Sequence, residues 1–203
     1  MSLLLNKNGL FLFHGDTYLY LDLAAKEVED HQRTIQAVFN IPFPTVDAAL
    51  RWDDETVFFF KGMDCVKYDL IKKSVAPGYP KKILFEWKGI WPTDISDAVL
   101  VDDKVYFFRS TQFIVFDVNS TRAETGYPRP IAERWPGVWE SIDGVECLEQ
   151  GQMLFLKDNQ VMQYDMSLGK MPPPYAHKLD DFVKSYRPSD DGEANTCTAL
   201  AVR

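Results

Sequence analysis

The sequence lacks long apolar runs. No segment approaches the ~18 consecutive apolar residues that a membrane-spanning helix requires, so we expect no membrane association. The apolar stretch at residues 2–5 stops at Asn6; it is too short for the apolar core of a signal peptide and has no basic residues before it. The sequence therefore favours a cytoplasmic location, and secretion by a route without a signal peptide remains an alternative.

Cysteine is scarce, and positive charge is in the minority. Cys65, Cys147 and Cys197 are an odd number without CxxC spacing, which predicts reduced thiols. Lys and Arg number 22 against 30 Asp and Glu, and no basic cluster occurs, so we expect no nucleic-acid partner. An acidic surface attracts small cations and basic ligands, but such a charge is also ordinary for solubility.

The sequence also lacks the common catalytic motifs. It contains no glycine loop that cradles phosphate, no nucleophile elbow and no recurrent pairing of histidine with a carboxylate. We therefore predict that the protein is not an enzyme and requires no cofactor.

A fourfold repeat dominates what the sequence does contain. An aromatic and aliphatic run recurs at residues 10–15, 57–62, 105–110 and 153–158. Each copy is followed by a second apolar run that ends in Asp, at Asp22, Asp69, Asp117 and Asp165. These aspartates lie 47, 48 and 48 residues apart, a period typical of one supersecondary unit stacked on its own copies. Because they recur in every unit, we expect them to accept hydrogen bonds from turn amides.

The sequence of each unit predicts an antiparallel meander. Strand-like runs alternate with turn residues such as Gly62, and a short outer strand and a short helix follow. We predict an all-β fold, a four-bladed β-propeller with a short helix at the outer edge of each blade. The chain forms a single domain over residues 1–203, with blades at about 1–44, 45–94, 95–140 and 141–195. We expect residues 196–203 to close the ring as the inner strand of the first blade.

The motifs together resemble the hemopexin repeat over essentially the whole chain. They are Asp47-Ala48, Phe59-Phe60-Lys61-Gly62, Tyr68-Asp69, Gly78-Tyr79-Pro80 and Trp135-Pro136-Gly137. The dipeptides of WD40 repeats and the paired glycines of kelch repeats are absent. The resemblance implies the four-bladed propeller of hemopexin, of the C-terminal domain of matrix metalloproteinases, of photopexins and of plant albumins of the pea albumin-2 type.

The resemblance also implies an ion, Ca²⁺ or Na⁺, in the central channel. Backbone carbonyls would ring such a hard cation. Carried over to this sequence, they belong to Asp47, Asp97 and Asp143, with a deeper ring from Ala49, Val99 and Val145. The alternative is that Asp-Ala only begins a crowded inner strand.

Haem and polyamines are the other ligands that the resemblance suggests. Haem ligation by imidazole would need His14, His31 or His177, and His14 stands where other repeats carry Lys or Arg. A polyamine would be attracted by acidic turn residues, namely Asp53, Asp54, Asp102, Asp103 and Glu149. The protein would thus be a non-enzymatic binding protein.

A protein-recognition module is the alternative function. Aromatic residues such as Trp91 and Trp139 would then anchor a partner on the outer face. We expect a monomer or a homodimer.

Overall fold

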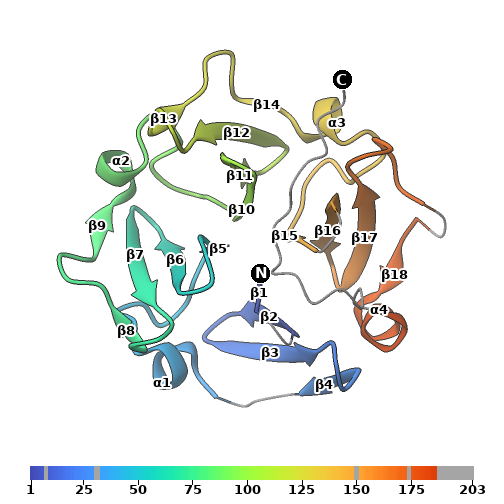
Figure 1. Ribbon diagram of the computed structural model, residues 1–203, viewed down its shortest axis with the longest axis horizontal. Helices are drawn as coiled ribbons and strands as arrows, with labels where there is room; N and C mark the ends of the chain where they lie inside the picture. Colours follow the sequence, from blue (N-terminus) through green and yellow to red (C-terminus); the bar gives the residue numbers. More distant parts are fainter. Residues whose placement is uncertain (7–8, 30–32, 149–150, 173–174, 187–203) are drawn as a thin grey trace.

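The computed structural model describes residues 1–6, 9–29, 33–148, 151–172 and 175–186. Four antiparallel sheets stand radially around a central axis, which confirms the predicted four-bladed propeller (Figure 1). Blade 1 consists of β1 (Ser2–Leu5), β2 (Gly9–His14), β3 (Thr17–Asp22) and β4 (Glu27–Glu29). Blade 2 consists of β5 (Ala48–Arg51), β6 (Thr56–Lys61), β7 (Asp64–Asp69), β8 (Ser74–Val75) and β9 (Lys81–Lys82).

The other two blades repeat this plan. Blade 3 consists of β10 (Asp97–Val101), β11 (Lys104–Arg109), β12 (Gln112–Asp117), β13 (Arg122–Ala123) and β14 (Arg129–Pro130). Blade 4 consists of β15 (Gly144–Cys147), β16 (Gln152–Lys157), β17 (Gln160–Asp165) and β18 (His177–Lys178). In each blade the first strand is the innermost, so β1, β5, β10 and β15 surround the axis.

The helices are few and short. They are α1 (Ile35–Phe39), α2 (Ile83–Glu86), α3 (Ile131–Arg134) and α4 (Leu179–Ser185). Both α2 and α3 contain four residues, about one turn. Helices this few and short do not support the expectation of a short helix at the outer edge of each blade.

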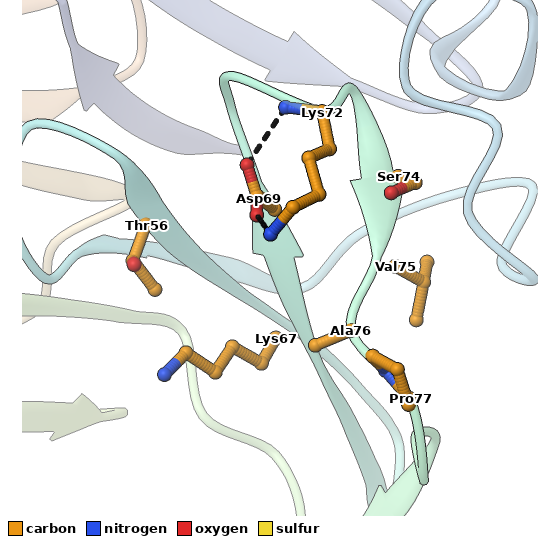
Figure 2. Close-up of a pocket in the computed structure, with 8 residues that line it drawn as sticks. All are labelled: Thr56, Lys67, Asp69, Lys72, Ser74, Val75, Ala76 and Pro77. Atoms are coloured by element: carbon orange, nitrogen blue, oxygen red, sulfur yellow. Dashed lines mark hydrogen bonds and ion pairs between the residues drawn. The ribbon is translucent and has the colours of Figure 1, made fainter.

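The four recurrent aspartates hold the turn that follows the third strand. Asp69, for example, accepts a hydrogen bond from the backbone amide of Ile71 at 3.0 Å. The amide and the ammonium of Lys72 donate to the same carboxylate at 2.8 and 2.7 Å (Figure 2). Asp22, Asp117 and Asp165 accept turn amides in the same way. The predicted structural role of these residues is confirmed.

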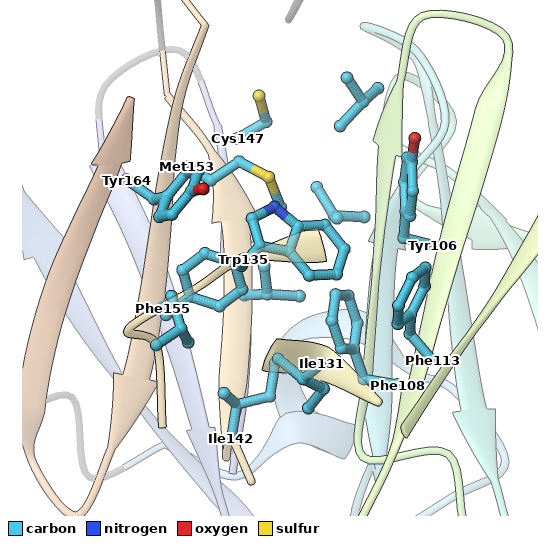
Figure 3. Close-up of a cluster of buried hydrophobic side chains, with 14 of the residues drawn as sticks. Tyr106, Phe108, Phe113, Ile131, Trp135, Ile142, Cys147, Met153, Phe155 and Tyr164 are labelled. Atoms are coloured by element: carbon cyan, nitrogen blue, oxygen red, sulfur yellow. The ribbon is translucent and has the colours of Figure 1, made fainter. Parts of the chain in front are cut away.

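The core consists of hydrophobic clusters packed between blades. Between blades 3 and 4, the fully buried Trp135 lies among Phe108, Phe113 and Phe155, with ring centroids 4.9–5.7 Å away (Figure 3). Alternate residues of each strand face opposite sides of the sheet, so every blade contributes to two such clusters. This packing fixes how the inner strands approach one another at the axis.

Among the described residues, β1 is the inner strand of blade 1, with Ser2 opposite Phe13 and Leu5 opposite Leu10. That residues 196–203 also take part in this blade stays a prediction. Leu3 and Leu5 are buried in the cluster between blades 1 and 4, which explains why an apolar segment suits this place. Residues 196–203 lie outside the described residues.

The register of blade 3 differs from our expectation. The backbone amides of Asp47, Ser96 and Asp143 donate to the carbonyls of Phe60, Phe108 and Leu156, at 2.9, 2.8 and 2.8 Å. Ser96 is therefore the structural counterpart of Asp47 and Asp143, and Asp97 lies one position further along the strand. The physical reason is that the turn between β10 and β11 is shorter than the turn between β5 and β6.

The cysteines are not all reduced. Cys65 is a free, buried thiol, and burial raises its pKa to about 12. Cys147 is disulfide-bonded, so the prediction of reduced thiols is wrong for this residue. Cys197 lies outside the described residues.

Candidate functional site

At the propeller axis, backbone amides from three blades converge on one carboxylate. Asp97 of β10 is fully buried. Its Oδ2 accepts hydrogen bonds from the amides of Val145 at 2.8 Å and Leu3 at 3.1 Å. Its Oδ1 accepts from the Ser2 hydroxyl at 2.8 Å and from the Ala49 amide at 3.4 Å. Asp97 therefore bonds to the inner strands of all three other blades.

Ser2 completes this arrangement. Its hydroxyl oxygen accepts the Ala49 amide at 2.8 Å while its proton goes to Asp97. Blades 1, 2 and 3 are thus linked by a short relay at the axis. Because each donor is a buried group, each needs a partner of this kind, and Asp97 provides it.

Burial dominates the electrostatics of Asp97. Loss of solvent raises the pKa of its carboxyl to about 8, against the lowering effect of the bonds from Val145, Leu3 and Ser2. The negative charge of Glu146 raises the pKa further. The carboxylate is therefore well hydrogen-bonded, but its charge lacks a cationic partner among the described residues.

Glu146 of β15 forms a second, similar centre. Its Oε2 accepts the Leu5 amide and its Oε1 accepts the Cys147 amide, both at 2.8 Å, and the residue is buried. Burial raises the pKa of Glu146 to about 7. The Arg51 guanidinium, by its positive charge, acts in the opposite direction on this pKa.

Arg51 stands beside this second centre with one nitrogen unsatisfied. Its Nη2 forms an ion pair with Asp54 at 2.5 Å, whereas its buried Nη1 has no hydrogen-bond partner among the described residues. Two buried carboxylates therefore lie near the propeller axis, and beside one of them stands a guanidinium with one unsatisfied nitrogen.

Only some of the predicted channel residues meet at the axis. Asp97, Ala49 and Val145 do, because the Asp97 side chain accepts hydrogen bonds from the amides of the other two residues. The ring of backbone carbonyls stays a prediction. Val99 is buried in the cluster between blades 3 and 4. The sequence argument missed Glu146, which was detectable as a charged residue at a strand position where blade 2 has Leu50.

The side chains of Asp47 and Asp143 serve turns instead. Asp47 accepts from the Lys61 ammonium at 2.5 Å and from the Gly62 amide at 2.8 Å. Asp143 accepts from the Asp158 amide at 2.9 Å. Both side chains hold the turn between the second and third strands of their blades.

The predicted haem ligands are not brought together. His14 is exposed at the end of β2 in blade 1, and His177 begins β18 in blade 4. His31 lies outside the described residues. Among the part of the chain that is described, no group of three or more His, Cys, Asp or Glu side chains is arranged to hold a metal ion.

The acidic turn residues and the tryptophans have local partners. Asp53 accepts the Glu55 amide at 2.8 Å, and Asp103 accepts from Asn119 at 3.2 Å. Asp102 has a positive φ of 52° in its turn, and Glu149 lies outside the described residues. Trp91 faces the Arg109 guanidinium at 5.5 Å, and the partly buried Trp139 packs on the core between blades 3 and 4.

The comparison with protein families identifies the repeat. The family model described as Hemopexin matches residues 46–92 and 95–140, which cover blades 2 and 3. No curated protein sequence matches the chain. Within the described residues, no helix has the length and apolarity needed to cross a membrane.

Solved structures show the same fold at low sequence identity. A plant albumin from Cicer arietinum showing hemagglutination has a TM-score of 0.76 and 17% identity, covering 89% of this chain and 93% of that one. The hemopexin fold protein CP4 from cow pea has a TM-score of 0.74 and 16% identity, covering 89% and 93%. A Cicer arietinum plant lectin with two metal binding sites has a TM-score of 0.73 and 17% identity, covering 90% and 94%.

Proposed function

The chain belongs to the hemopexin-like repeat family, and from this premise we propose that it is a non-enzymatic binding protein whose central channel holds a small cation. The observation that carries the proposal is the pair of buried carboxylates, Asp97 and Glu146, at the centre of the propeller. Buried carboxylates are normally paired with a cation or coordinate a metal ion, because desolvation of an unpaired charge is costly. Neither forms an ion pair among the described residues.

Glu146 is the residue best suited to touch the cation. Each of its carboxylate oxygens accepts one hydrogen bond, which leaves a lone pair free on each oxygen. The oxygens of Asp97 together accept four donors and are nearly saturated. The cation would therefore bind at the level of Glu146, and its positive charge would favour the ionised form of the nearby Asp97 carboxyl.

The chemistry of these groups selects a hard cation. Carboxylate and backbone oxygens suit Ca²⁺ and Na⁺. Since no cluster of acidic, His or Cys side chains surrounds Glu146 in the described part of the chain, backbone carbonyls and water would provide the remaining ligands. This differs from a site built from carbonyls alone, because here a side chain contributes. The metal sites of the Cicer arietinum lectin support an ion-binding role for this fold.

Calorimetric titration of chelator-treated protein with Ca²⁺, and separately with Na⁺, tests the proposal. We expect Glu146→Gln to weaken binding at least about tenfold, as loss of a metal-site interaction typically does. The matched control is Asp47→Asn, whose side chain faces Lys61 and Gly62 rather than the channel, and it should bind as the parent does. Equal binding by Glu146→Gln, or loss of binding in Asp47→Asn, would overturn the proposal.

Protein recognition is a second candidate function, favoured by one observation. Phe85 and Leu84 of α2 are 74% and 54% exposed, and the 53% exposed Met63 lies beside them, its carbonyl accepting the Ile83 amide at 2.9 Å. Exposed apolar residues gathered at one edge are typical of interaction surfaces. Sedimentation of the protein and of Phe85→Ser tests self-association through this edge, which only the parent should show. Haem and spermine titrations test the two remaining ligand candidates.

A further inference from the structure

Blade 2 carries a hollow on its outer part, separate from the carboxylates at the propeller axis. The hollow has a volume of about 240 Å³ and lies over β6, β7 and β8 (Figure 2). Thr56 and Lys67 stand on one side of it, and Ser74 and Val75 on the other. Ligand pockets for drug-sized molecules are typically ~300–1,000 Å³, so this hollow suits a smaller group.

In the other blades, the chain's own side chains occupy the equivalent place. The strand-end aspartates Asp22, Asp69, Asp117 and Asp165 lie opposite Gly9, Thr56, Lys104 and Gln152, respectively. In blade 3, Lys104 bridges Asp117 and Glu124. In blade 4, Gln152 bonds to Asp165. In blade 1, the Tyr20 ring lies against Gly9, 3.0 Å from where a Cβ would stand.

Blade 2 replaces the bridging pair of blade 3 with two small residues. Thr56 stands where blade 3 has Lys104. Ala76 stands where blade 3 has Glu124, because the amides of Ala76 and Glu124 make the same bond, 2.8 Å long, to the carbonyls of Lys67 and Val115. The exchange removes two long side chains and leaves the hollow open. It also places Lys67 where blade 3 has the apolar Val115.

The groups around the hollow define the ligand. The Lys67 ammonium forms no ion pair or hydrogen bond with a described side chain. Its charge acts on Glu86 only at longer range, lowering the pKa of that carboxyl, so the ammonium can still pair with the carboxylate of a ligand. The hydroxyls of Thr56 and Ser74 and the Asp69 carboxylate offer hydrogen bonds to hydroxyl groups, and Val75 and Pro77 add an apolar wall. Lys72, which also lines the hollow, pairs with Asp69 at 2.7 Å, so Lys67 is the charge left without an ion pair. A single positive charge favours a singly charged anion and would repel a polycation.

We propose that this hollow binds one acidic sugar residue, a hexuronic or sialic acid. Its carboxylate pairs with Lys67, its hydroxyls bond to Thr56, Ser74 and Asp69, and its carbon skeleton lies on Val75 and Pro77. The site is separate from the channel cation, so either can exist without the other.

Calorimetric or NMR titration with methyl glucuronide, with methyl glucoside as the neutral control, tests the proposal. A single sugar that fits a shallow site should bind in the millimolar range, about −4 kcal/mol. The methyl glycoside of N-acetylneuraminic acid distinguishes a sialic acid from a hexuronic acid. Equal binding of methyl glucoside, tighter binding of inorganic phosphate, or no binding of either acidic sugar would overturn the proposal.

Two variants locate the site. Thr56→Lys combined with Ala76→Glu refills the hollow with the pair found in blade 3, and we expect it to abolish binding. Lys67→Gln should weaken binding at least about tenfold, the cost of losing one charged hydrogen bond. The matched control is Lys73→Gln, an exposed lysine outside the hollow, which should bind as the parent does. Unchanged binding in Lys67→Gln would overturn the site even if the refilled variant failed to fold.

Discussion

The Ser2 hydroxyl donates a hydrogen bond of 2.8 Å to the carboxylate of Asp97, 95 residues away in the sequence. Ser2 lies on the inner strand of blade 1 and Asp97 on that of blade 3, and blades 2 and 4 stand between them around the axis. The bond therefore crosses the channel. Together with the bonds from the amides of Leu3 and Val145, this bond makes the Asp97 side chain the point at which blades 1, 3 and 4 are joined.

Replacement of Asp97 should reveal this role. Asp97→Ala leaves the amides of Leu3 and Val145 buried without acceptors, at a cost of about 1–3 kcal/mol for each. Asp97→Asn should cost much less, because its carbonyl oxygen can accept both amides while its NH₂ group donates to the Ser2 oxygen. Urea unfolding of the three proteins measures the difference. Equal stability of the Ala and Asn variants would contradict the assigned role.

Stability should fall as the pH rises from 5 to 9 in protein freed of metal ions. Burial raises the pKa of Asp97 to about 8 and that of Glu146 to about 7, from ordinary values of 3.8 and 4.5. Between those values the folded state binds more protons than the unfolded state, so the resulting stabilisation is complete below about pH 4. It is lost as the pH rises through 7 and 8.

The pH experiment has an internal control. The lowered pKa values of Asp69, Asp117 and Asp165 affect stability only at acid pH, outside this range. The double variant Asp97→Asn, Glu146→Gln should flatten the urea midpoint against pH, and saturating Ca²⁺ should flatten it in the parent. A midpoint that rises between pH 5 and 9 would show that the two carboxyls are not the dominant groups.

The repeat made the propeller predictable, but not the contents of its channel. Aromatic runs such as Val57–Phe60 and the strand-end aspartates recur because every blade needs the same packing and the same turn. The register of the inner strands was harder to predict, because we could align these strands only by residue type. We aligned Asp97 with Asp47 by residue type, whereas the hydrogen bonds of Ser96 and Asp47 to Phe108 and Phe60 fix the register one residue earlier.

Glu146 and the side-chain role of Asp97 escaped prediction because each occurs in one blade only. Asp97 and Glu146 break the repeat, and their role depends on amides of Leu3, Leu5 and Val145 that converge only after the ring closes. Sequence periodicity reports what blades share and gives no information on such contacts. The same reasoning applies to the hollow of blade 2, which exists because Thr56 and Ala76 depart from blade 3.

Trp135 should be a major contributor to stability. It is fully buried between blades 3 and 4 and contacts aromatic rings from both, including Phe113 at 4.9 Å and Phe155 at 5.7 Å. Trp135→Ala leaves a cavity that the two blades cannot easily close, and we expect a loss of about 3–5 kcal/mol in urea unfolding. The control Phe85→Ala, at a 74% exposed site, should change stability by at most about 0.5 kcal/mol.

The position of Gly9 should tolerate no side chain, although the other blades carry Thr56, Lys104 and Gln152 at the equivalent position. A Cβ at Gly9 would lie 2.1 Å from the carbonyl oxygen of Leu21, a backbone atom that cannot move without breaking the β2–β3 ladder. The comparison is Gly62→Ala, where no atom lies within 4 Å and only the positive φ of 56° is unfavourable, costing about 1–2 kcal/mol. We expect Gly9→Ala to lower the melting temperature more than Gly62→Ala, because ladder bonds and the Tyr20 contact are lost together. If Gly9→Ala were the milder change, β2 would have to shift away from β3, and amide exchange at Leu10 and Leu21 would be faster than in the parent.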